Sequence, residues 1–402
     1  MATGKPRVLL LTGYFDWFSG YQETALAAWF PRYADTEVIA SDLVSPMFSD
    51  AHLAGLGISR RYQPGSKTEH GVRMTRFTSY EKRAMVWSGQ VRKYIEGQDY
   101  DLIVQVMPGQ LMPLAGTLAQ NRSVRIAFYG DNSAMWSHLS HAQRLLKGAA
   151  FALSKGAIYS LVNKKADLVC GYTPNTVERL APYGGGKRIA LLALPFDPDR
   201  FFFDDQSRSA QRASMGYVDT DTVILAAGKF SPRKRLDLLV EAFQRMAKKN
   251  PDLKLLLVGF DDSEHSRKLR AHIGTYPGLA EKVKVFGFVD NDILNAMFNA
   301  ADIGVWPRLP AITIQQAMGT GLSVVLPRND LVGHLIRNGS GCYFHESDGH
   351  ASAQLQEAIE SQLATDFSGV GRKVRTEQNA WLGADELVKS LLSRAGVGGL
   401  AQ

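Results

Sequence analysis

A cluster of basic side chains in one loop is the first feature of this sequence that could do chemistry. Gly228 ends an apolar run, and Lys229, Arg233, Lys234 and Arg235 follow it before a strongly amphipathic stretch, in the segment LAAGKFSPRKRLDLLVEAF. Four cations so close together repel one another, so a bound polyanion would stabilise the loop. A pyrophosphate is the natural candidate. The alternative is a solvated basic loop, which is the usual state of a charge run.

A second candidate for anion binding is the start of a helix in the segment WPRLPAITIQQAMGTGLSVVLP. Pro310 suits the first helical position, and Gly319 and Gly321 would end the helix. The free N–H groups of Ile312 and Thr313 would then point at an anion. The signal is weak by itself, because every helix has such an end.

A third loop, GYFDWFSGYQETALAAWF, contains Gly20 just before an amphipathic stretch. A glycine there lets a phosphate approach the N–H groups of a helix N-terminus. It serves equally well in a tight turn with no ligand. The loop has no G-x-G-x-x-G fingerprint, so the sequence gives no support for dinucleotide binding.

Parallel sheets must position these loops. Short apolar runs alternate with longer amphipathic stretches, which is typical of parallel strands joined by crossover helices. The first half contains the expected strands Val8–Leu11, Glu37–Ala40, Leu102–Val106, Arg125–Tyr129, Leu168–Gly171 and Ile189–Leu192. The second half contains Val223–Ala227, Leu253–Val258, Val283–Phe286, Ile303–Trp306 and Ser323–Leu326. We predict an α/β protein with two doubly wound, Rossmann-like domains that face each other across a ligand-binding cleft.

A Pro-punctuated segment without helical or alternating period, LPFDPDRFFFDD, divides the two halves. It predicts a hinge near Pro195–Asp205. We therefore expect a first domain over residues 1–195 and a ligand-binding domain over residues 196–375. Residues 376–402 would form a C-terminal segment whose amphipathic helix, Asn379–Arg394, packs back on the first domain.

The composition is that of a globular protein, with 402 residues, 45% hydrophobic and 21% charged residues. The first apolar run is too short for a signal peptide, and no stretch approaches the roughly 20 apolar residues of a membrane span. Cys170 and Cys342 lie in apolar or Gly-rich contexts that suit reduced thiols. We expect a cytoplasmic protein. The net charge of +7 favours an anionic partner, but no motif indicates nucleic acid.

One segment, HAQRLLKGAAFALSKGAIYSLVNKK, is both apolar and basic. It contains no acidic residue and five basic ones: Arg144, Lys147, Lys155, Lys164 and Lys165. Such a helix can rest on an anionic membrane surface, at the inner face of the membrane, and bring an enzyme to a lipid-linked acceptor. The commoner alternative is a core helix with solvated lysines.

The second half of the chain resembles the donor domain of retaining glycosyltransferases of family four. The resemblance rests on the segments GKFSPRKRLDLLVEAF, LKLLLVGF, KVKVFGFVDNDILNAMFNAADIGVWP, QQAMGTGLSVVLP and HLIRNGSGCYF, taken in that order. It implies the GT-B fold and transfer of a hexose, with retention, from a UDP- or GDP-linked sugar, without a metal or other cofactor. The acceptor would be a sugar, a lipid-linked molecule or a small molecule, in polysaccharide, glycolipid or secondary-metabolite assembly.

The resemblance also implies roles for individual residues. Lys229 and Lys234 would hold the donor diphosphate and stabilise it as the leaving group. The N–H groups of Ile312 and Thr313 would lie on the phosphates, and the backbone near Val289 would lie beside the nucleotide base.

In the first domain, Gly20 would face the diphosphate. Gly130 stands where the family often has a histidine that contacts the donor sugar, and Asp131 and Asn132 follow it. These two polar residues either replace the histidine or form an Asx turn.

The sequence departs from the family at two glutamates. Arg308 stands where a glutamate contacts the donor sugar, and Gln316 stands where another contacts the ribose. Gln316 can still hydrogen-bond a hydroxyl, but Arg308 cannot accept a hydrogen bond. A buried guanidinium needs an anionic partner, which would be Asp131 or an acidic group on the ligand; an arginine exposed at the rim of the cleft would need none. The departure leaves two alternatives open: a GT-B enzyme with altered chemistry, such as a phosphorylase or a transferase with an unusual donor, and a catalytically silent relative that binds a nucleotide.

Overall fold

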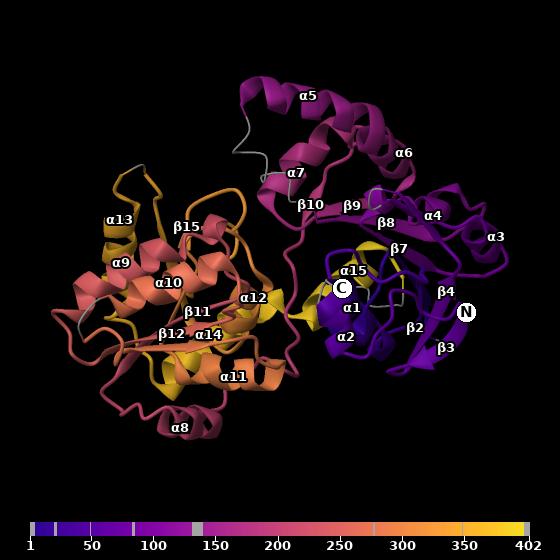
Figure 1. Cartoon of the computed structure of the whole chain (residues 1–402). Coiled ribbons are helices and arrows are strands. Elements are labelled where there is room, and N and C mark those ends of the chain that lie inside the picture. The colour runs from indigo at the N-terminus through magenta and orange to yellow at the C-terminus, as the bar shows by residue number, and fades with distance from the viewer. Residues whose placement is uncertain are drawn as a thin grey trace. The chain divides into compact units, whose positions relative to one another are not determined.

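The computed structural model describes residues 5–19, 22–48, 50–82, 85–130, 140–275, 278–347 and 349–397. The chain forms two compact units (Figure 1). Unit 1 comprises Met1–Ala193 together with Ala384–Gln402, and unit 2 comprises Leu194–Gly383. The second boundary therefore follows Gly383, later in the chain than the expected division between residues 375 and 376.

Unit 1 is built on a sheet with the strand order β10-β9-β8-β7-β1-β2-β4-β3, in which only the β3–β4 pair is antiparallel. The strands are β1 Arg7–Leu11, β2 Asp35–Ser41, β3 Gly65–Glu69, β4 Val72–Phe77, β7 Leu102–Val106, β8 Val124–Tyr129, β9 Leu168–Gly171 and β10 Ala190–Leu191. A short hairpin of β5 Tyr80–Lys82 and β6 Met85–Trp87 lies outside this sheet. Strand β1 has the buried apolar sequence of a central parallel strand, since Leu9, Leu10 and Leu11 are all inaccessible.

Helices and short turns cover the sheet of unit 1. The helices are α1 Gln22–Trp29, α2 Asp50–Gly55, α3 Val91–Glu96, α4 Leu114–Leu118, α5 His141–Phe151, α6 Ala157–Lys165, α7 Pro174–Leu180 and α15 Ala384–Arg394. A π-helical turn, Ala152–Gly156, joins α5 to α6. Short 3-10 turns are η1 Trp17–Ser19, η2 Phe30–Arg32, η3 Pro108–Gln110 and η6 Ala181–Tyr183.

Unit 2 has an entirely parallel sheet in the order β13-β12-β11-β14-β15-β16. The strands are β11 Thr222–Ala227, β12 Leu253–Val258, β13 Val283–Phe286, β14 Ile303–Val305, β15 Ser323–Pro327 and β16 Gly341–Phe344. The helices are α8 Asp205–Ser214, α9 Leu236–Ala247, α10 Glu264–Gly274, α11 Asn291–Ala300, α12 Ile312–Gly319, α13 Ala351–Gln362 and α14 Gly369–Asn379, with 3-10 turns η7 Pro232–Lys234 and η8 Ala380–Leu382. The apolar stripe of α9 is buried against the sheet, in one core cluster with β11 and β12.

The expected strands are all present, with small shifts at their ends. The expected helix Asn379–Arg394 is present from Ala384 onward as α15, but its expected start is wrong, because Asn379 ends α14 and the turn η8 lies between the two helices. Helix α14 stays in unit 2 because Arg372, Arg375 and Asn379 are buried there. Helix α15 packs against α1 in unit 1.

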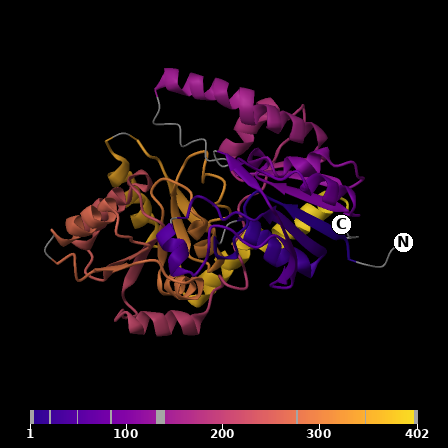
Figure 2. The same cartoon turned by 45° about the vertical axis from the view of Figure 1, so that its right-hand side comes forward.

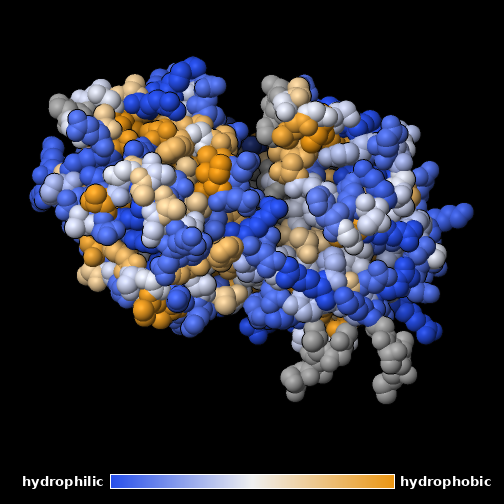
Figure 3. Space-filling view, turned by 90° about the horizontal axis from the view of Figure 1, so that it is seen from below, coloured by the Kyte–Doolittle hydropathy of each residue, from blue (hydrophilic) through white to orange (hydrophobic). Residues whose placement is uncertain are grey.

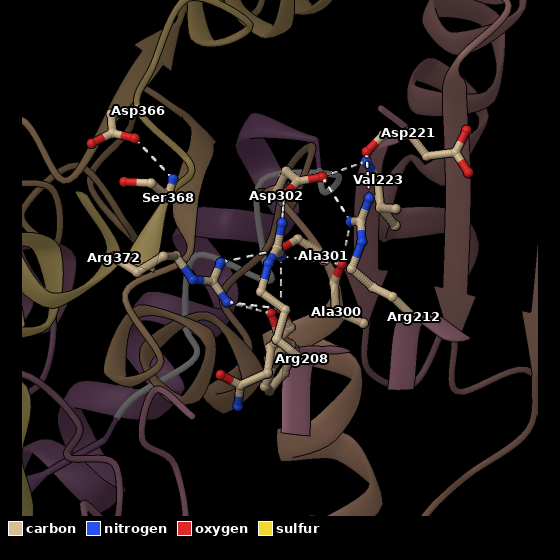
Figure 4. A network of polar contacts seen from close by, with 12 residues as sticks. Arg208, Arg212, Asp221, Val223, Ala300, Ala301, Asp302, Asp366, Ser368 and Arg372 are labelled. Carbon is tan, nitrogen blue, oxygen red and sulfur yellow. Dashed lines mark hydrogen bonds and ion pairs between the residues drawn. The ribbon is translucent and has the colours of Figure 1, made fainter. Parts of the chain in front are cut away.

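A buried network of arginines fixes the end of helix α11. Figure 4 shows the guanidinium groups of Arg208, Arg212 and Arg372 converging on the segment from Ala300 to Asp302. Arg372 donates to the carbonyl oxygens of Phe298 at 2.8 Å and Ala301 at 3.1 Å. These carbonyls have no partner within the helix, so the arginines satisfy them.

Asp302 completes the network. Its carboxylate accepts hydrogen bonds from Arg208 at 2.6 Å and from the N–H of Val223 at 2.7 Å. It therefore links α8 to the beginning of β11.

The face drawn in Figure 3 has hydrophobic residues in separate patches among hydrophilic ones. Such a mixture is usual for globular proteins. Both cysteines are free, and burial raises the pKa of the Cys170 thiol to about 12.

The expectation that no stretch of the chain approaches a membrane span is wrong. By length and composition alone, the helix His141–Lys165 is long and apolar enough to cross a membrane. Alanines and leucines keep its mean hydropathy high, while lysines lie mainly toward its C-terminal end.

Candidate functional site

The candidate site lies in unit 2, where β11 and β14 end and α12 begins. Gly228 follows β11 with a φ of 124°, a backbone conformation that favours glycine. The backbone of Gly259, at the end of the neighbouring strand β12, packs so closely that a Cβ there would lie 2.4 Å from the Gly228 oxygen. The two glycines thus let the ends of β11 and β12 pass close together, and the space beside Gly228 is left to side chains from η7 and α12.

Lys234 directs its ammonium group to this space. A Cβ built on Gly228 would lie 3.3 Å from Lys234 Nζ and 3.4 Å from Thr313 Oγ1. Burial lowers the pKa of Lys234, and no carboxylate in the described part of the chain forms an ion pair with it. A half-buried cation without a counter-ion is poised to bind an anion.

The N-terminus of α12 is fixed beside the same glycine. The Thr313 hydroxyl donates to the Ala227 carbonyl at 2.8 Å, and Trp306 Nε1 donates to that carbonyl at 2.8 Å. These bonds hold the first turn of α12 against the end of β11. The N-cap residue Ala311 offers no side-chain acceptor, so the N–H groups of Ile312 and Thr313 are left for a ligand. The helix begins at Ile312, so the expectation that Pro310 is its first residue is wrong.

Gln316 lies one turn into α12. The residue is buried, and its Oε1 has no hydrogen-bond partner among the described residues. A buried amide oxygen without a partner is costly, so a ligand hydroxyl here would satisfy it.

The other cations of the basic loop are in different situations. Arg235 pairs with Asp237, with 3.0 Å between Nη2 and Oδ2. Lys229 is exposed near Asp261, whose pKa is lowered to about 2, mainly by hydrogen bonds from Ser263 and Ser266 and less by Lys229. The expected repulsion among four cations is thus reduced at Arg235, which forms an ion pair with Asp237, whereas Lys229 has only a weak Coulombic interaction with Asp261.

Arg233 is half-buried in the turn η7, and Gly228 precedes this turn in the loop that follows β11. Val289 is half-buried in the loop after β13, beside the exposed Phe288. Val289 belongs to the same carboxyl edge of the sheet, two strands away from Gly228.

Arg308 lies in the same hollow as Lys234, which Ala227, Phe230 and Trp306 also line. It is not the buried guanidinium that we considered, because its side chain is 44% exposed. Its Nε lies 3.5 Å from Glu346 Oε1, in the loop that follows β16. Sequence analysis missed this partner because Glu346 is far away in the chain.

Three expected residues of the first domain, Gly20, Asp131 and Asn132, lie outside the described residues. Gly130 is described and directly follows β8. A Cβ on Gly130 would lie 2.7 Å from the ring of Tyr172, so this position has no room for a side chain.

Two buried carboxylates follow β1 in unit 1, and sequence analysis did not single them out. Asp16 accepts hydrogen bonds from Tyr62 Oη at 3.0 Å and from the N–H of Ser45 at 3.3 Å. Glu23, in the first turn of α1, has one oxygen without a partner among the described residues. Burial raises the pKa of Glu23 to about 7. Their signal in the sequence was the position of Asp16 in the loop after an apolar strand and of Glu23 at the start of the next helix.

The described residues contain no group of three or more histidines, cysteines or acidic residues placed to hold a metal ion.

Residues 221–365, which lie in unit 2, match the family model described as Glycosyl transferases group 1. Mannosylfructose-phosphate synthase of Agrobacterium fabrum is 29% identical over 154 residues, which are 36% of this chain and 33% of that protein. A phosphatidyl-myo-inositol mannosyltransferase of Mycobacterium leprae is 29% identical over 199 residues, 47% of this chain and 50% of that protein. The matches to these two relatives thus span half of their length or less.

Solved structures match nearly the whole chain. Sucrose-phosphate synthase from Thermosynechococcus elongatus has a TM-score of 0.65 at 18% identity, covering 96% of this chain and 97% of that one. HepE of Anabaena in complex with UDP has a TM-score of 0.66 at 19% identity, covering 96% and 99%. The expected fold class, α/β with two Rossmann-like domains of the GT-B type, is confirmed.

Proposed function

We propose that this chain is a glycosyltransferase that moves a hexose from a UDP- or GDP-linked donor to an acceptor, with retention. The observation that carries the proposal is the meeting, beside Gly228, of the N-terminus of α12 with the Lys234 ammonium, which has no ion-pair partner among the described residues. The segment that builds this arrangement is also the one that matches the glycosyl transferases group 1 model.

The arrangement suits a departing diphosphate. As the bond between sugar and phosphate breaks, negative charge grows on the phosphate oxygens. A fixed ammonium group and preorganised N–H groups stabilise that charge without reorganising in the transition state. Lys234 and the N–H groups of Ile312 and Thr313 supply these elements, and Lys229 adds a weaker, solvated charge.

The residues that contact the nucleoside part of the donor are proposed from their positions in unit 2. The amide oxygen of Gln316, which has no partner among the described residues, accepts a hydrogen bond from a ribose hydroxyl, and the backbone at Val289 lies beside the base. Gly228 and Arg233 complete the phosphate site. The acceptor is a sugar, a polyol phosphate or a lipid-linked molecule, as the names of the relatives suggest.

A panel of UDP, GDP, UDP-glucose and GDP-mannose tests the proposal. Specific binding raises the melting temperature of the folded chain, because only the folded state has the site. We expect one of the two nucleoside diphosphates to raise the melting temperature clearly. We also expect the chain to hydrolyse the matching nucleotide-sugar slowly or to transfer its sugar slowly. If no nucleotide at millimolar concentration changes the melting temperature, the proposal is wrong.

Arg308 favours a second candidate, a GT-B enzyme with altered chemistry. A guanidinium group binds carboxylate or phosphate through two parallel hydrogen bonds, and Arg308 shares the hollow with Lys234. The donor would then carry an acidic sugar, or inorganic phosphate would be the acceptor of a phosphorylase. Turnover with UDP-glucuronate or with phosphate, but not with neutral donors and alcohols, would favour this candidate. Nucleotide binding without any turnover would identify a catalytically silent relative.

A further inference from the structure

The helical segment His141–Lys165 of unit 1 has two halves with different surroundings. Figures 1 and 2 show α5 and α6 as one continuous helical path, with the π-helical turn Ala152–Gly156 between them. The two halves must therefore be considered separately before any role is assigned to the apolar stretch.

The second half belongs to the core of unit 1. In α6, Tyr159, Val162 and Asn163 are buried. The Tyr129 hydroxyl donates to Asn163 Oδ1 at 2.7 Å, and the rings of Tyr129 and Tyr159 lie 4.6 Å apart. A helix fixed to β8 in this way cannot also cross a bilayer without dismantling the core.

The first half has almost no partner in the described structure. None of the described side chains of α5 is buried, and Leu145, Leu146 and Leu153 are 62%, 73% and 86% exposed. Phe151 alone reaches inward, where its ring meets those of Tyr159 and Tyr183. A helix this short is only marginally stable in water, even with the capping box that Ser140 and Gln143 form at its start.

The exposed leucines share one face of α5. With 3.6 residues per turn, Leu145, Leu146 and Ala149 lie together, and Leu153 falls near them at the start of the π-helical turn. Phe151, which packs inward, lies on the opposite side. The leucine stripe therefore points away from the core of unit 1.

The charge around this stripe has one sign. The segment His141–Lys165 contains five basic residues and no acidic one, and the exposed Lys147 directly follows Leu146 while the exposed Lys155 closely follows Leu153 in the chain. An apolar stripe flanked by lysines matches the acyl boundary and the anionic headgroups of a bilayer. A protein partner would have to be both apolar and acidic.

We propose that α5 and the π-helical turn form a membrane-docking surface that lies in the headgroup region of an anionic bilayer, with the leucine stripe inserted and α6 held in unit 1. The inference does not depend on the donor chemistry. It would bring the enzyme to the leaflet where a lipid-linked acceptor lies.

Flotation of the full chain with lipid vesicles tests the proposal. We expect the chain to bind vesicles of phosphatidylcholine with phosphatidylglycerol and to bind vesicles of phosphatidylcholine alone more weakly. Salt should weaken binding to the vesicles that contain phosphatidylglycerol. The triple variant Leu145→Ser/Leu146→Ser/Leu153→Ser should bind at least about tenfold more weakly, because three apolar insertions are lost. Lys147→Gln/Lys155→Gln should lose most of the salt dependence.

A matched control replaces three apolar residues that are exposed elsewhere: Met47→Ser/Val218→Ser/Val370→Ser. This variant should bind vesicles as the parent chain does. Circular dichroism and nucleotide binding, measured on every variant, separate loss of docking from loss of fold or of the donor site. Release of the bound chain by alkaline carbonate is the expected sign of surface binding.

Four results would overturn the proposal. The first is absence of binding to anionic vesicles, and the second is equal binding by the parent chain and the leucine variant. The third is a leucine-dependent change of oligomeric state with no vesicle binding, which would make the stripe a protein interface. Resistance to carbonate would instead indicate a span and contradict the surface geometry.

Discussion

Lys234 and Arg235 are neighbours in the chain, yet their side chains are in opposite electrostatic situations. Arg235 is neutralised by Asp237, whereas burial lowers the pKa of Lys234 and no described carboxylate compensates its charge. The depressed pKa means that the empty site disfavours the ammonium form, and a bound phosphate would favour it. Among the cations of the loop, Lys234 is therefore the one whose removal should matter most for an anionic ligand.

We predict that Lys234→Ala weakens binding of the nucleoside diphosphate by roughly ten- to a hundredfold, because a charge-assisted hydrogen bond contributes about 1.5–3 kcal/mol. Lys229→Ala should weaken it less, since Lys229 is exposed. Isothermal titration calorimetry measures both, with Lys249→Ala as the control for loss of an exposed lysine elsewhere in unit 2. Equal affinity of Lys234→Ala and the parent chain would remove Lys234 from the phosphate site.

Arg308 gives a prediction about the donor. Because the Arg308–Glu346 pair is partly exposed, Arg308→Gln should change the free energy of unfolding by less than about 1 kcal/mol. The same variant should lower kcat/KM for an acidic donor such as UDP-glucuronate at least about tenfold, through loss of a bidentate ion pair, and leave that for UDP-glucose nearly unchanged.

The family glutamate can be restored only with its neighbour changed. Arg308→Glu alone would place two carboxylates side by side, so it should be combined with Glu346→Gln. If this double variant raises turnover on neutral donors, Arg308 determines specificity. If neither variant alters discrimination between acidic and neutral donors, Arg308 is only an exposed ion-pair partner.

Glu23 gives a prediction about pH. Burial raises its folded-state pKa from 4.5 to about 7, so the folded state binds a proton more tightly than the unfolded state does. Its contribution to stability is therefore lost as pH rises from about 4.5 to 7 and stays lost above 7. Glu23→Gln should raise the free energy of unfolding at pH 8 by about 1–3 kcal/mol and have little effect near pH 4.5.

Urea unfolding of Glu23→Gln at pH 5 and pH 8 checks the sign. The exposed Glu241, changed to Gln, is the control. A variant that is destabilised at pH 8 would show that the Glu23 carboxylate is charged and has a partner in the folded protein.

At the scale of elements, the end of α11 depends on side chains from two other helices. Arg208 and Arg212 reach it from α8 and Arg372 reaches it from α14, so three guanidinium groups bind the carbonyls at the negative end of the helix dipole. Burial lowers the pKa of Arg372 to about 9, because the charged guanidinium loses its hydration there. Removing the arginine would leave buried carbonyls unsatisfied, which costs more than the loss of a hydrogen bond.

We predict that Arg372→Met destabilises unit 2 by about 3–5 kcal/mol, as expected when a buried polar network is broken. Differential scanning calorimetry should show a lower melting temperature, whereas the control Lys373→Ala, on the exposed side of the same helix, should be close to the parent chain. A melting temperature of Arg372→Met equal to that of the control would mean that the network contributes no stability.

The elements that the sequence predicted well are buried on both faces. Strands such as Leu253–Val258 are continuous apolar runs, so composition alone identifies them. The strands β3 to β6 were missed because their exposed, charged residues obscure the alternation, and Arg76 is buried where an apolar residue would be expected. Arg76 is accommodated by the carbonyls of Ser41 and Phe15, and no local pattern shows these partners.

The candidate site was predictable to the same degree. Lys234, Ile312 and Thr313 could be found because a basic loop and a helix start are local signals. Two other features depend on contacts between segments that are far apart in the chain: the pairing of Arg308 with Glu346 and the burial of Glu23. Such contacts leave no local pattern in a single sequence. The hinge at Pro195–Asp205 stays a prediction.

At the scale of the whole molecule, the chain enters and leaves unit 2 at one place. Phe196 lies opposite Gly383 in a parallel bridge, and its N–H donates to the Leu382 carbonyl at 3.0 Å. Unit 2 is therefore an insertion whose two ends meet, while unit 1 is made of two segments separated by the whole of unit 2.

This discontinuity sets an order for folding during synthesis. Helix α15 follows unit 2 in the chain, so it leaves the ribosome after the whole of unit 2, and its buried residues Leu387, Val388, Leu391 and Leu392 complete unit 1. Unit 2 is continuous, so it can close its core while unit 1 still lacks the helix that packs against α1. Unit 1 thus begins before unit 2 in the order of synthesis but finishes folding after it, and a nascent chain stalled just before Ala384 would carry a complete unit 2 beside an unfinished unit 1.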